Sequence, residues 1–175
     1  HKTVNMQIDY VSFIMADAFA AQYFVADSIR IDTGTRRSTT ARDNPHNIYG
    51  PAIIARNSSG VLLYIQYFIL GKTHNEHGPA VTHYHSSGVT VKKIYCVNNK
   101  RHNEHIPSVI TYHSNGYISL TEYYLNDKRH REHGPALTFY DSKGAVLRNV
   151  YFTHGRQMWD RESSVEHNQW ICNLL

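Results

Sequence analysis

Short apolar and aromatic runs, separated by turn-forming residues, recur four times between residues 46 and 158. In the second copy, residues 79–85 form the first run, and residues 86–88 form a turn in which Gly88 can adopt a positive φ. A second run covers residues 89–97, and a second turn follows at Asn98 and Asn99, residue types that tolerate left-handed backbone. Each copy therefore predicts an antiparallel β-hairpin.

The copies keep a constant length of 28 residues. Each proline is expected to mark where the chain enters a new strand, because proline lacks an N–H donor and holds its predecessor extended. After the second turn, the chain is expected to run back extended to the next proline. A fixed period of this size indicates a repeat architecture, and we expect the tyrosine column to be buried. The invariant columns are Pro51, Pro79, Pro107 and Pro135; Gly60, Gly88, Gly116 and Gly144; and Tyr67, Tyr95, Tyr123 and Tyr151.

Two positions on one face of the second strand exchange character in alternate copies. Copies one and three carry an apolar residue and then a polar one, whereas copies two and four carry a cation and then an apolar residue. This pattern predicts a superperiod of 56 residues in which the buried position moves along the strand. The pairs are Tyr64/Gln66, Lys92/Ile94, Leu120/Glu122 and Arg148/Val150.

The two ends of the chain leave the repeat. Residues 1–31 carry apolar side chains at three- and four-residue steps, which predicts an amphipathic helix, and residues 32–45 form a polar, basic loop. The spacing of Ser163 and Glu166 predicts a capping box before a short apolar segment. We therefore expect three parts: an N-terminal helical cap and basic loop (1–45), four hairpin repeats (46–158) and a C-terminal capping helix (159–175). No charge-free run approaches the ~20 residues of a membrane span.

Composition and charge narrow the function only slightly. Apolar residues make up 41% of the chain and charged residues 18%, which is typical of a folded globular domain. The formal net charge of +4 allows an acidic partner without selecting one. Cys96 and Cys172 are too few for a disulfide framework and are expected to be free thiols, with Cys96 in the core. We expect the protein to be located in the cytoplasm of a cell or of a virus-infected host. The alternative is that it is secreted as an effector.

The repeat resembles a known family. A Gly-Pro-Ala step after His-x-Glu, a glycine turn, a tyrosine and an Asn-Gly-Lys-like turn resemble the MORN-like repeats, specifically the longer variant related to MORN variant repeats. Residues 100–105 (Lys-Arg-His-Asn-Glu-His) and 128–136 carry the resemblance most clearly. It implies a mainly β array of antiparallel hairpins in an elongated, twisted sheet. It also implies an interaction or membrane-proximal module rather than a catalyst.

The histidine and glutamate columns are the sharpest chemical candidates. Neutral imidazole and carboxylate bind divalent ions, so these residues are weak candidates for a metal site. In the alternative, each histidine bonds a backbone carbonyl or a glutamate of its own or a neighbouring copy and so fixes the linker. A catalytic site needs one asymmetric constellation, whereas these residues recur in successive copies, so we favour the structural role and expect no enzyme activity and no cofactor. The residues are His74, His102 and His130 with Glu76, Glu104 and Glu132.

A column of cations follows the second turn and, with two neighbouring arginines, could form a basic stripe along one edge. Such a stripe could follow phosphates or acidic lipid, although the glutamates four residues later would partly neutralise it. The candidate ligand-binding residues are Lys72, Lys100, Arg101, Lys128, Arg129 and Arg156. We expect a non-enzymatic scaffold for protein–protein interaction. The alternative is a binding module for nucleic acid or an acidic membrane surface along this stripe.

Overall fold

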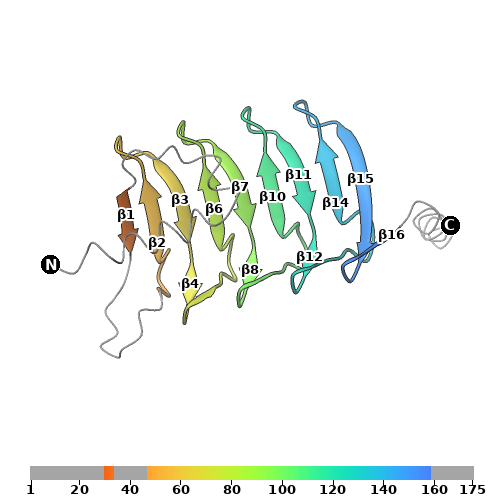
Figure 1. Ribbon diagram of the computed structural model, residues 1–175, viewed down its shortest axis with the longest axis horizontal. Helices are drawn as coiled ribbons and strands as arrows, with labels where there is room; N and C mark the ends of the chain where they lie inside the picture. The colour runs from red at the N-terminus through yellow and green to blue at the C-terminus, as the bar shows by residue number, and fades with distance from the viewer. Residues whose placement is uncertain (1–29, 34–46, 159–175) are drawn as a thin grey trace.

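The computed structural model describes residues 30–33 and 47–158, and this part of the chain is mainly β and contains no helix. Its strands form one open antiparallel sheet in the order β1-β2-β3-β6-β7-β10-β11-β14-β15-β16. Consecutive hairpins stand side by side along the long axis of the molecule (Figure 1). The strands are β1 (Arg30–Thr33), β2 (Ile53–Arg56), β3 (Leu62–Gln66), β6 (Val81–Tyr84), β7 (Thr90–Ile94), β10 (Val109–Tyr112), β11 (Ile118–Glu122), β14 (Leu137–Tyr140), β15 (Val146–Thr153) and β16 (Arg156–Met158).

Three short ribbons extend the first three hairpins beyond one end of their strands. Each ribbon consists of two antiparallel two-residue strands joined by the second turn. The glycine turns lie at the opposite ends of the strands (Figure 1). The ribbon strands are β4 (Phe68–Ile69) with β5 (Lys72–Thr73), β8 (Cys96–Val97) with β9 (Lys100–Arg101), and β12 (Tyr124–Leu125) with β13 (Lys128–Arg129).

Both predicted turns are present. The four repeated glycines of the first turn have φ between 81° and 89°, a region in which a Cβ would be strained. The second turn also uses positive φ, at Asn98 (51°) and Asn99 (67°) in the second copy. The chain that follows this turn differs from the expected extended linker. Its first two residues form a ribbon strand, and the rest bends, because a side chain such as Asn75 bonds the Pro79 carbonyl at 3.2 Å and the His77 N–H at 3.0 Å.

The invariant tyrosines lie at a break in the second strand. In the first three copies, the tyrosine N–H bonds a backbone carbonyl of the next copy at 2.8 Å, for example Tyr95 to Ser108. The pairing within each of these hairpins ends one residue before the tyrosine, and the residue after the tyrosine shares a strand face with the residue before it. The tyrosines are half-buried, so the prediction that their column is the buried one was wrong. The buried column is the next one: Phe68 (5% exposed), Cys96 (7%) and Tyr124 (4%).

The register confirms that each alternating pair shares one sheet face. Gln66 lies between Ile53 and Val81, and Glu122 lies between Val109 and Leu137. The prediction that the buried position moves along the strand in alternate copies was wrong, because the second position is buried even where it is polar: Gln66 is 3% exposed and Glu122 is 9% exposed. Both are held by hydrogen bonds: Gln66 by Tyr64 and Thr73, and Glu122 by Tyr124 and Arg129. The two positions lie 56 residues apart, in line with the predicted superperiod.

Strand β1 corrects part of the prediction for the N-terminal region. Residues 30–33, expected at the junction of a helix and a loop, form a strand antiparallel to β2, from Arg30 opposite Arg56 to Thr33 opposite Ile53. The pairing satisfies backbone groups that the outer edge of β2 would otherwise leave open. The other residues of the predicted N-terminal cap and loop, and the predicted C-terminal helix, lie outside the described residues.

Candidate functional site

The histidine column joins neighbouring ribbons. His74, directly after β5, accepts a hydrogen bond at Nδ1 from the Asn98 N–H in the next turn, at 3.2 Å. The equivalent bonds run from Asn126 N–H to His102 Nδ1 (3.4 Å) and from His154 N–H to His130 Nδ1 (3.3 Å). Because Nδ1 accepts, the neutral ring carries its proton on Nε2. At Nδ1 the histidine thus bonds a backbone N–H, where the sequence suggested a backbone carbonyl as one of two possible partners.

The glutamates lie beside the other ring nitrogen. His74 Nε2 lies 3.3 Å from Glu76 Oε1, and His102 Nε2 lies 3.8 Å from Glu104 Oε1. Each of these histidines therefore contacts the next turn through one nitrogen and its own loop through the other. Within the described residues, no three His, Cys, Asp or Glu side chains are grouped to hold a metal ion. The geometry is that of a structural joint.

A second joint lies between ribbon strands and turns. The N–H of Asp127, in the turn between β12 and β13, donates to the Arg101 carbonyl at 3.0 Å. In return, Asp127 Oδ1 accepts from the Arg101 backbone N–H at 3.0 Å and from its Nε at 2.7 Å. Asn99 makes the corresponding pair of bonds with Thr73, at 2.9 and 2.6 Å. These turns are therefore tied to the preceding ribbon by reciprocal bonds.

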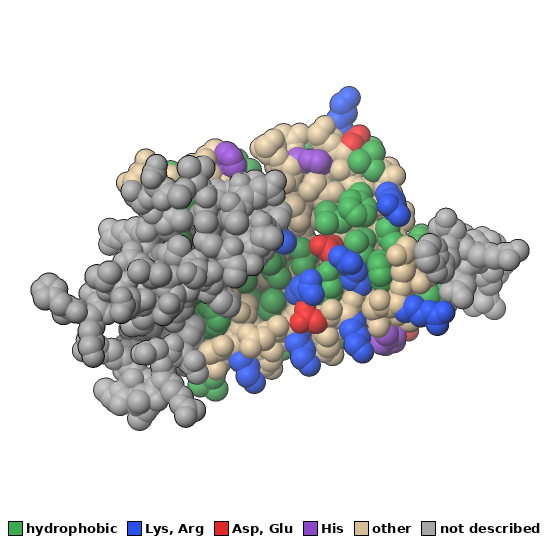
Figure 2. All heavy atoms as spheres, viewed as in Figure 1, with side chains coloured by type: hydrophobic (Ala, Val, Ile, Leu, Met, Phe, Trp, Pro, Cys, Tyr) green, Lys and Arg blue, Asp and Glu red, His purple; other side chains and the backbone are tan. Residues whose placement is uncertain are grey.

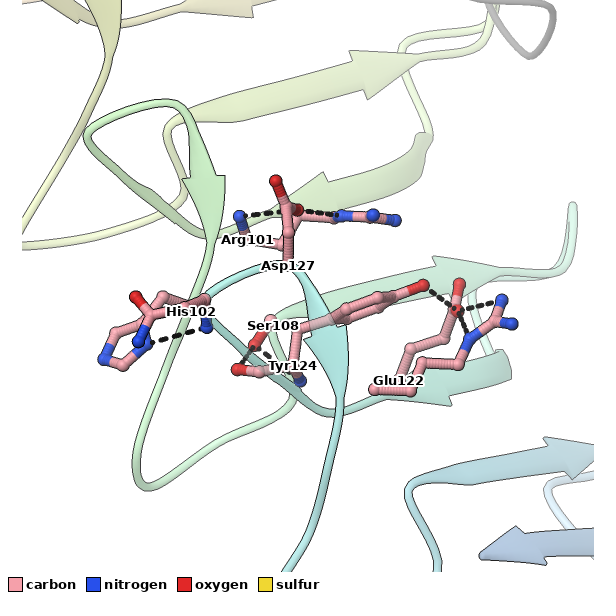
Figure 3. A network of polar contacts seen from close by, with 8 residues as sticks. Arg101, His102, Ser108, Glu122, Tyr124 and Asp127 are labelled. Carbon is pink, nitrogen blue, oxygen red and sulfur yellow. Dashed lines mark hydrogen bonds and ion pairs between the residues drawn. The ribbon is translucent and has the colours of Figure 1, made fainter. Parts of the chain in front are cut away.

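Arg101 and Arg129 belong to a polar network around the buried Tyr124. Figure 3 shows this network, with Arg101, Glu122, Tyr124 and Asp127 labelled. The Tyr124 hydroxyl donates to Glu122 Oε2 at 2.8 Å, and Arg129 Nη2 donates to the same oxygen at 3.0 Å. The Arg101 guanidinium lies 4.0 Å from the centre of the Tyr124 ring, a cation–π distance. Burial and the Glu122 carboxylate raise the pKa of Tyr124. Although burial opposes it, Asp127 raises the pKa of Arg101, so both arginines are committed to partners within the array.

Ser108 has a structural role that its variation among the copies did not reveal. The equivalent position carries alanine in the other three copies, and Ser108 is fully buried. Its hydroxyl donates to the Tyr124 carbonyl and accepts from the Tyr124 N–H, both at 3.1 Å. Only the structure could show this contact, because the two residues lie 16 positions apart, Ser108 just before β10 and Tyr124 in β12.

The cation column after the second turn is exposed. Figure 2 shows Lys and Arg side chains recurring along one long side of the array, with further charged side chains of both signs on the adjoining face. Within the described residues, no carboxylate forms an ion pair with a member of this column. Glu76 and Glu104, four residues after Lys72 and Lys100, lie beside His74 and His102. The column consists of Lys72, Lys100, Lys128 and Arg156.

Two grooves lie where successive loops meet the sheet. The first has a volume of about 640 Å³, and its lining includes Tyr67, His74, Tyr84 and Lys93. The second has a volume of about 530 Å³, and its lining includes Tyr95. The two grooves share the segment 75–79 of the loop between copies. Half-buried tyrosines and loop side chains of successive copies are therefore presented on one surface.

Cys96 lies in the core, as expected from its column. Burial raises the pKa of its thiol to about 11, and the nearby Asp127 contributes to the rise while Arg101 opposes it. At neutral pH this thiol is protonated, which makes it a poor nucleophile.

The remaining findings concern the chain as a whole. The described residues contain no helix that is long and apolar enough to cross a membrane. Comparisons with protein-family models, curated proteins and solved structures found no match.

Proposed function

We propose that this chain is a non-enzymatic repeat scaffold that binds a protein partner. The observation that carries the proposal is the pair of adjoining grooves, in which half-buried tyrosines of successive copies line one surface with loop side chains. Aromatic side chains are enriched at protein interfaces because they combine large apolar area with a polar tip. The expected resemblance to MORN-like repeats, whose members act mostly as interaction modules, agrees with this role.

The polar groups that first suggested chemistry support the same proposal. His74 and His102 bond turn N–H groups, Asp127 and Arg101 bond each other, and Glu122 bonds Tyr124 and Arg129. The histidine bonds and the Asp127–Arg101 bond hold neighbouring ribbons together, and the Glu122 bonds fix one ribbon to its own strand. A regular platform of this kind loses little conformational freedom when a partner binds.

Affinity capture at two salt concentrations tests the scaffold. Partners from the native host are captured on the full chain at 50 and 200 mM salt and quantified by mass spectrometry. The wild-type chain is compared with a variant in which the groove-lining Tyr67, Tyr84 and Tyr95 are replaced by serine and whose folding is checked by circular dichroism. We expect the same proteins to be retained at both salt concentrations and lost from the variant. Equal retention on the variant contradicts this proposal.

A second function is favoured by the exposed cation column. Lys72, Lys100, Lys128 and Arg156 are exposed and suited to the phosphates of nucleic acid or acidic lipid. The matched variant replaces the three lysines by glutamine. An anionic ligand is indicated instead if capture fails at 200 mM salt. In that case capture is also lost from the lysine variant and kept by the tyrosine variant.

A further inference from the structure

The outer edge of β15 differs from the equivalent edge in every earlier copy. The second strand of each of the first three hairpins is covered by the first strand of the next: β3 by β6, β7 by β10 and β11 by β14. Strand β15 pairs with β14 on its inner side, and β16 covers only its last residues, Tyr151–Thr153. Within the described residues, segment 148–150 has no neighbour on its outer side.

Side-chain burial changes at the same place. Leu63 and Val91, one copy apart, are 6% and 7% exposed. Leu147 occupies this position in the fourth copy and is 67% exposed, and its neighbour Val146 is 56% exposed. Exposed apolar side chains of this size beside an open strand edge mark a surface suited to a partner.

The backbone hydrogen bonding of the fourth copy also differs from that of the earlier copies at this edge. In the earlier copies the repeated tyrosine donates its N–H to the following copy, as Tyr95 does to Ser108, and the strand breaks there. Tyr151 instead pairs with Met158, so β15 runs unbroken for eight residues. Because alternate residues of an antiparallel strand point their backbone groups the same way, Asn149, two residues before Tyr151, directs its N–H and carbonyl to the open side.

We propose that the outer edge of β15 receives an extended strand of a partner protein, antiparallel to β15. This inference rests on the protein-binding function proposed above and names the surface and the kind of segment bound. Strand addition to an open edge is a general mode of peptide recognition, in which backbone bonds supply affinity and alternate side chains supply specificity.

The three internal junctions show what the incoming strand must look like. The residue opposite the Val150 position is Val81, Val109 or Leu137 in the earlier junctions, so an apolar side chain belongs there. The residue two positions later lies opposite Arg148. Arg148 is exposed, and within the described residues no carboxylate forms an ion pair with it. An acidic residue opposite Arg148 therefore completes the edge by charge complementarity.

The probe is a labelled peptide containing Pro-Ser-Val-Ile-Glu-Tyr, which is the sequence of residues 107–112 with glutamate in place of Thr111. Binding to the full chain is followed by fluorescence anisotropy. We expect saturable binding that weakens roughly tenfold when the peptide carries lysine instead of glutamate, since like charges then face each other. The variant Arg148→Glu should reverse this preference. The variant Asn149→Pro removes the N–H that points to the open side and should abolish binding of the peptide. The charge swap at Arg148 keeps the test valid even if Asn149→Pro fails to fold.

Hydrogen exchange shows whether the peptide binds at the edge of β15. It also shows whether the chain's own residues or a second copy cover this edge instead. The Asn149 amide should exchange fast in the free monomer and more slowly with peptide bound. An amide already protected in the free monomer shows that the chain's own residues cover the edge, and protection that rises with dimer formation shows a second copy there. Either result, or no saturable binding by the peptide, overturns the proposal. If the proposal for the edge is overturned but partners are still captured through the tyrosines, the scaffold function stands.

Discussion

Asp127 accepts two hydrogen bonds from Arg101, one from the backbone N–H at 3.0 Å and one from Nε of the side chain at 2.7 Å. The residues lie 26 positions apart and join a turn to the preceding ribbon. Gly155 occupies the equivalent position in the fourth copy and keeps only the backbone bond, to the Arg129 carbonyl at 2.8 Å. The backbone bond is therefore common to these joints, and the side-chain bonds are an addition that can be tested separately.

Replacing Asp127 separates these contributions. Asp127→Gly keeps the backbone bond and relieves the positive φ of 66°, but it removes the acceptor for Arg101. We expect a net loss of about 1 kcal/mol in the free energy of unfolding, measured by urea denaturation. Asp127→Asn is the matched control, because Asn99 bonds Thr73 at the same position, and it should lose less than half as much. Equal losses would show that the acceptor bond to the backbone contributes nothing.

The histidine joint is tested by His102→Ala. The substitution removes the acceptor for the Asn126 N–H and the contact with Glu104, so we expect a loss of about 1–2 kcal/mol. His105→Ala is the control in the same loop, because its side chain is exposed, and its stability should change by less than about 0.5 kcal/mol. A melt of His102→Ala that matches the wild type would remove the structural role of this column.

The periodic part of the fold was predictable because each copy carries its own turn chemistry. Gly88 marks the first turn and Asn98 the second, and both adopt the positive φ that their residue types indicate. The buried column was not predictable in the same way. Tyr95 and Cys96 point to opposite faces of the strand, and only the packing in the structure shows that the face carrying Cys96 is the buried one.

The candidate site was predictable in its residues but not in its geometry. Spacing showed that His102 and Glu104 recur with the repeat, yet it could not show which ring nitrogen bonds which group. From the sequence, Glu122 and Arg129 also had unrelated predicted roles. Glu122 was one of an alternating pair on one face of a strand, and Arg129 was a candidate ligand-binding residue in a basic stripe. The structure brings them together at 3.0 Å, because the ribbon folds Arg129 back towards the strand that carries Glu122.

The contact between Glu122 and Arg129 gives a third prediction. Glu122 is nearly buried, so Glu122→Ala leaves the Tyr124 hydroxyl and Arg129 without their shared acceptor. We expect a loss of about 2 kcal/mol in the free energy of unfolding. Glu122→Gln keeps an oxygen acceptor, as Gln66 does one superperiod earlier, and should lose less than half of this amount. If both variants lose the same, the charge rather than the hydrogen bonds stabilises this site.

The last prediction concerns pH. Burial lowers the pKa of His130, and the His154 ring, whose centroid lies 4.3 Å away, lowers it further, while Glu132 acts in the opposite direction. The folded pKa thus lies below the unfolded value of about 6.5, and the unfolded chain binds the proton more readily. The stability from neutral His130 is complete above about pH 6.5 and is lost as the pH falls through the folded pKa. Urea denaturation at pH 7.5, 6.0 and 5.0 measures the loss.

His154→Asn is the matched control for this titration. Asparagine occupies the equivalent turn position in two earlier copies, at Asn98 and Asn126, and adopts the same positive φ there. The variant keeps the N–H that donates to His130 Nδ1 but removes the neighbouring ring. We expect the pKa of His130, followed by NMR, to rise towards its usual range and the dependence of stability on pH to become weaker. An unchanged His130 titration would show that the neighbouring ring has no part in the shift and that burial alone lowers the pKa.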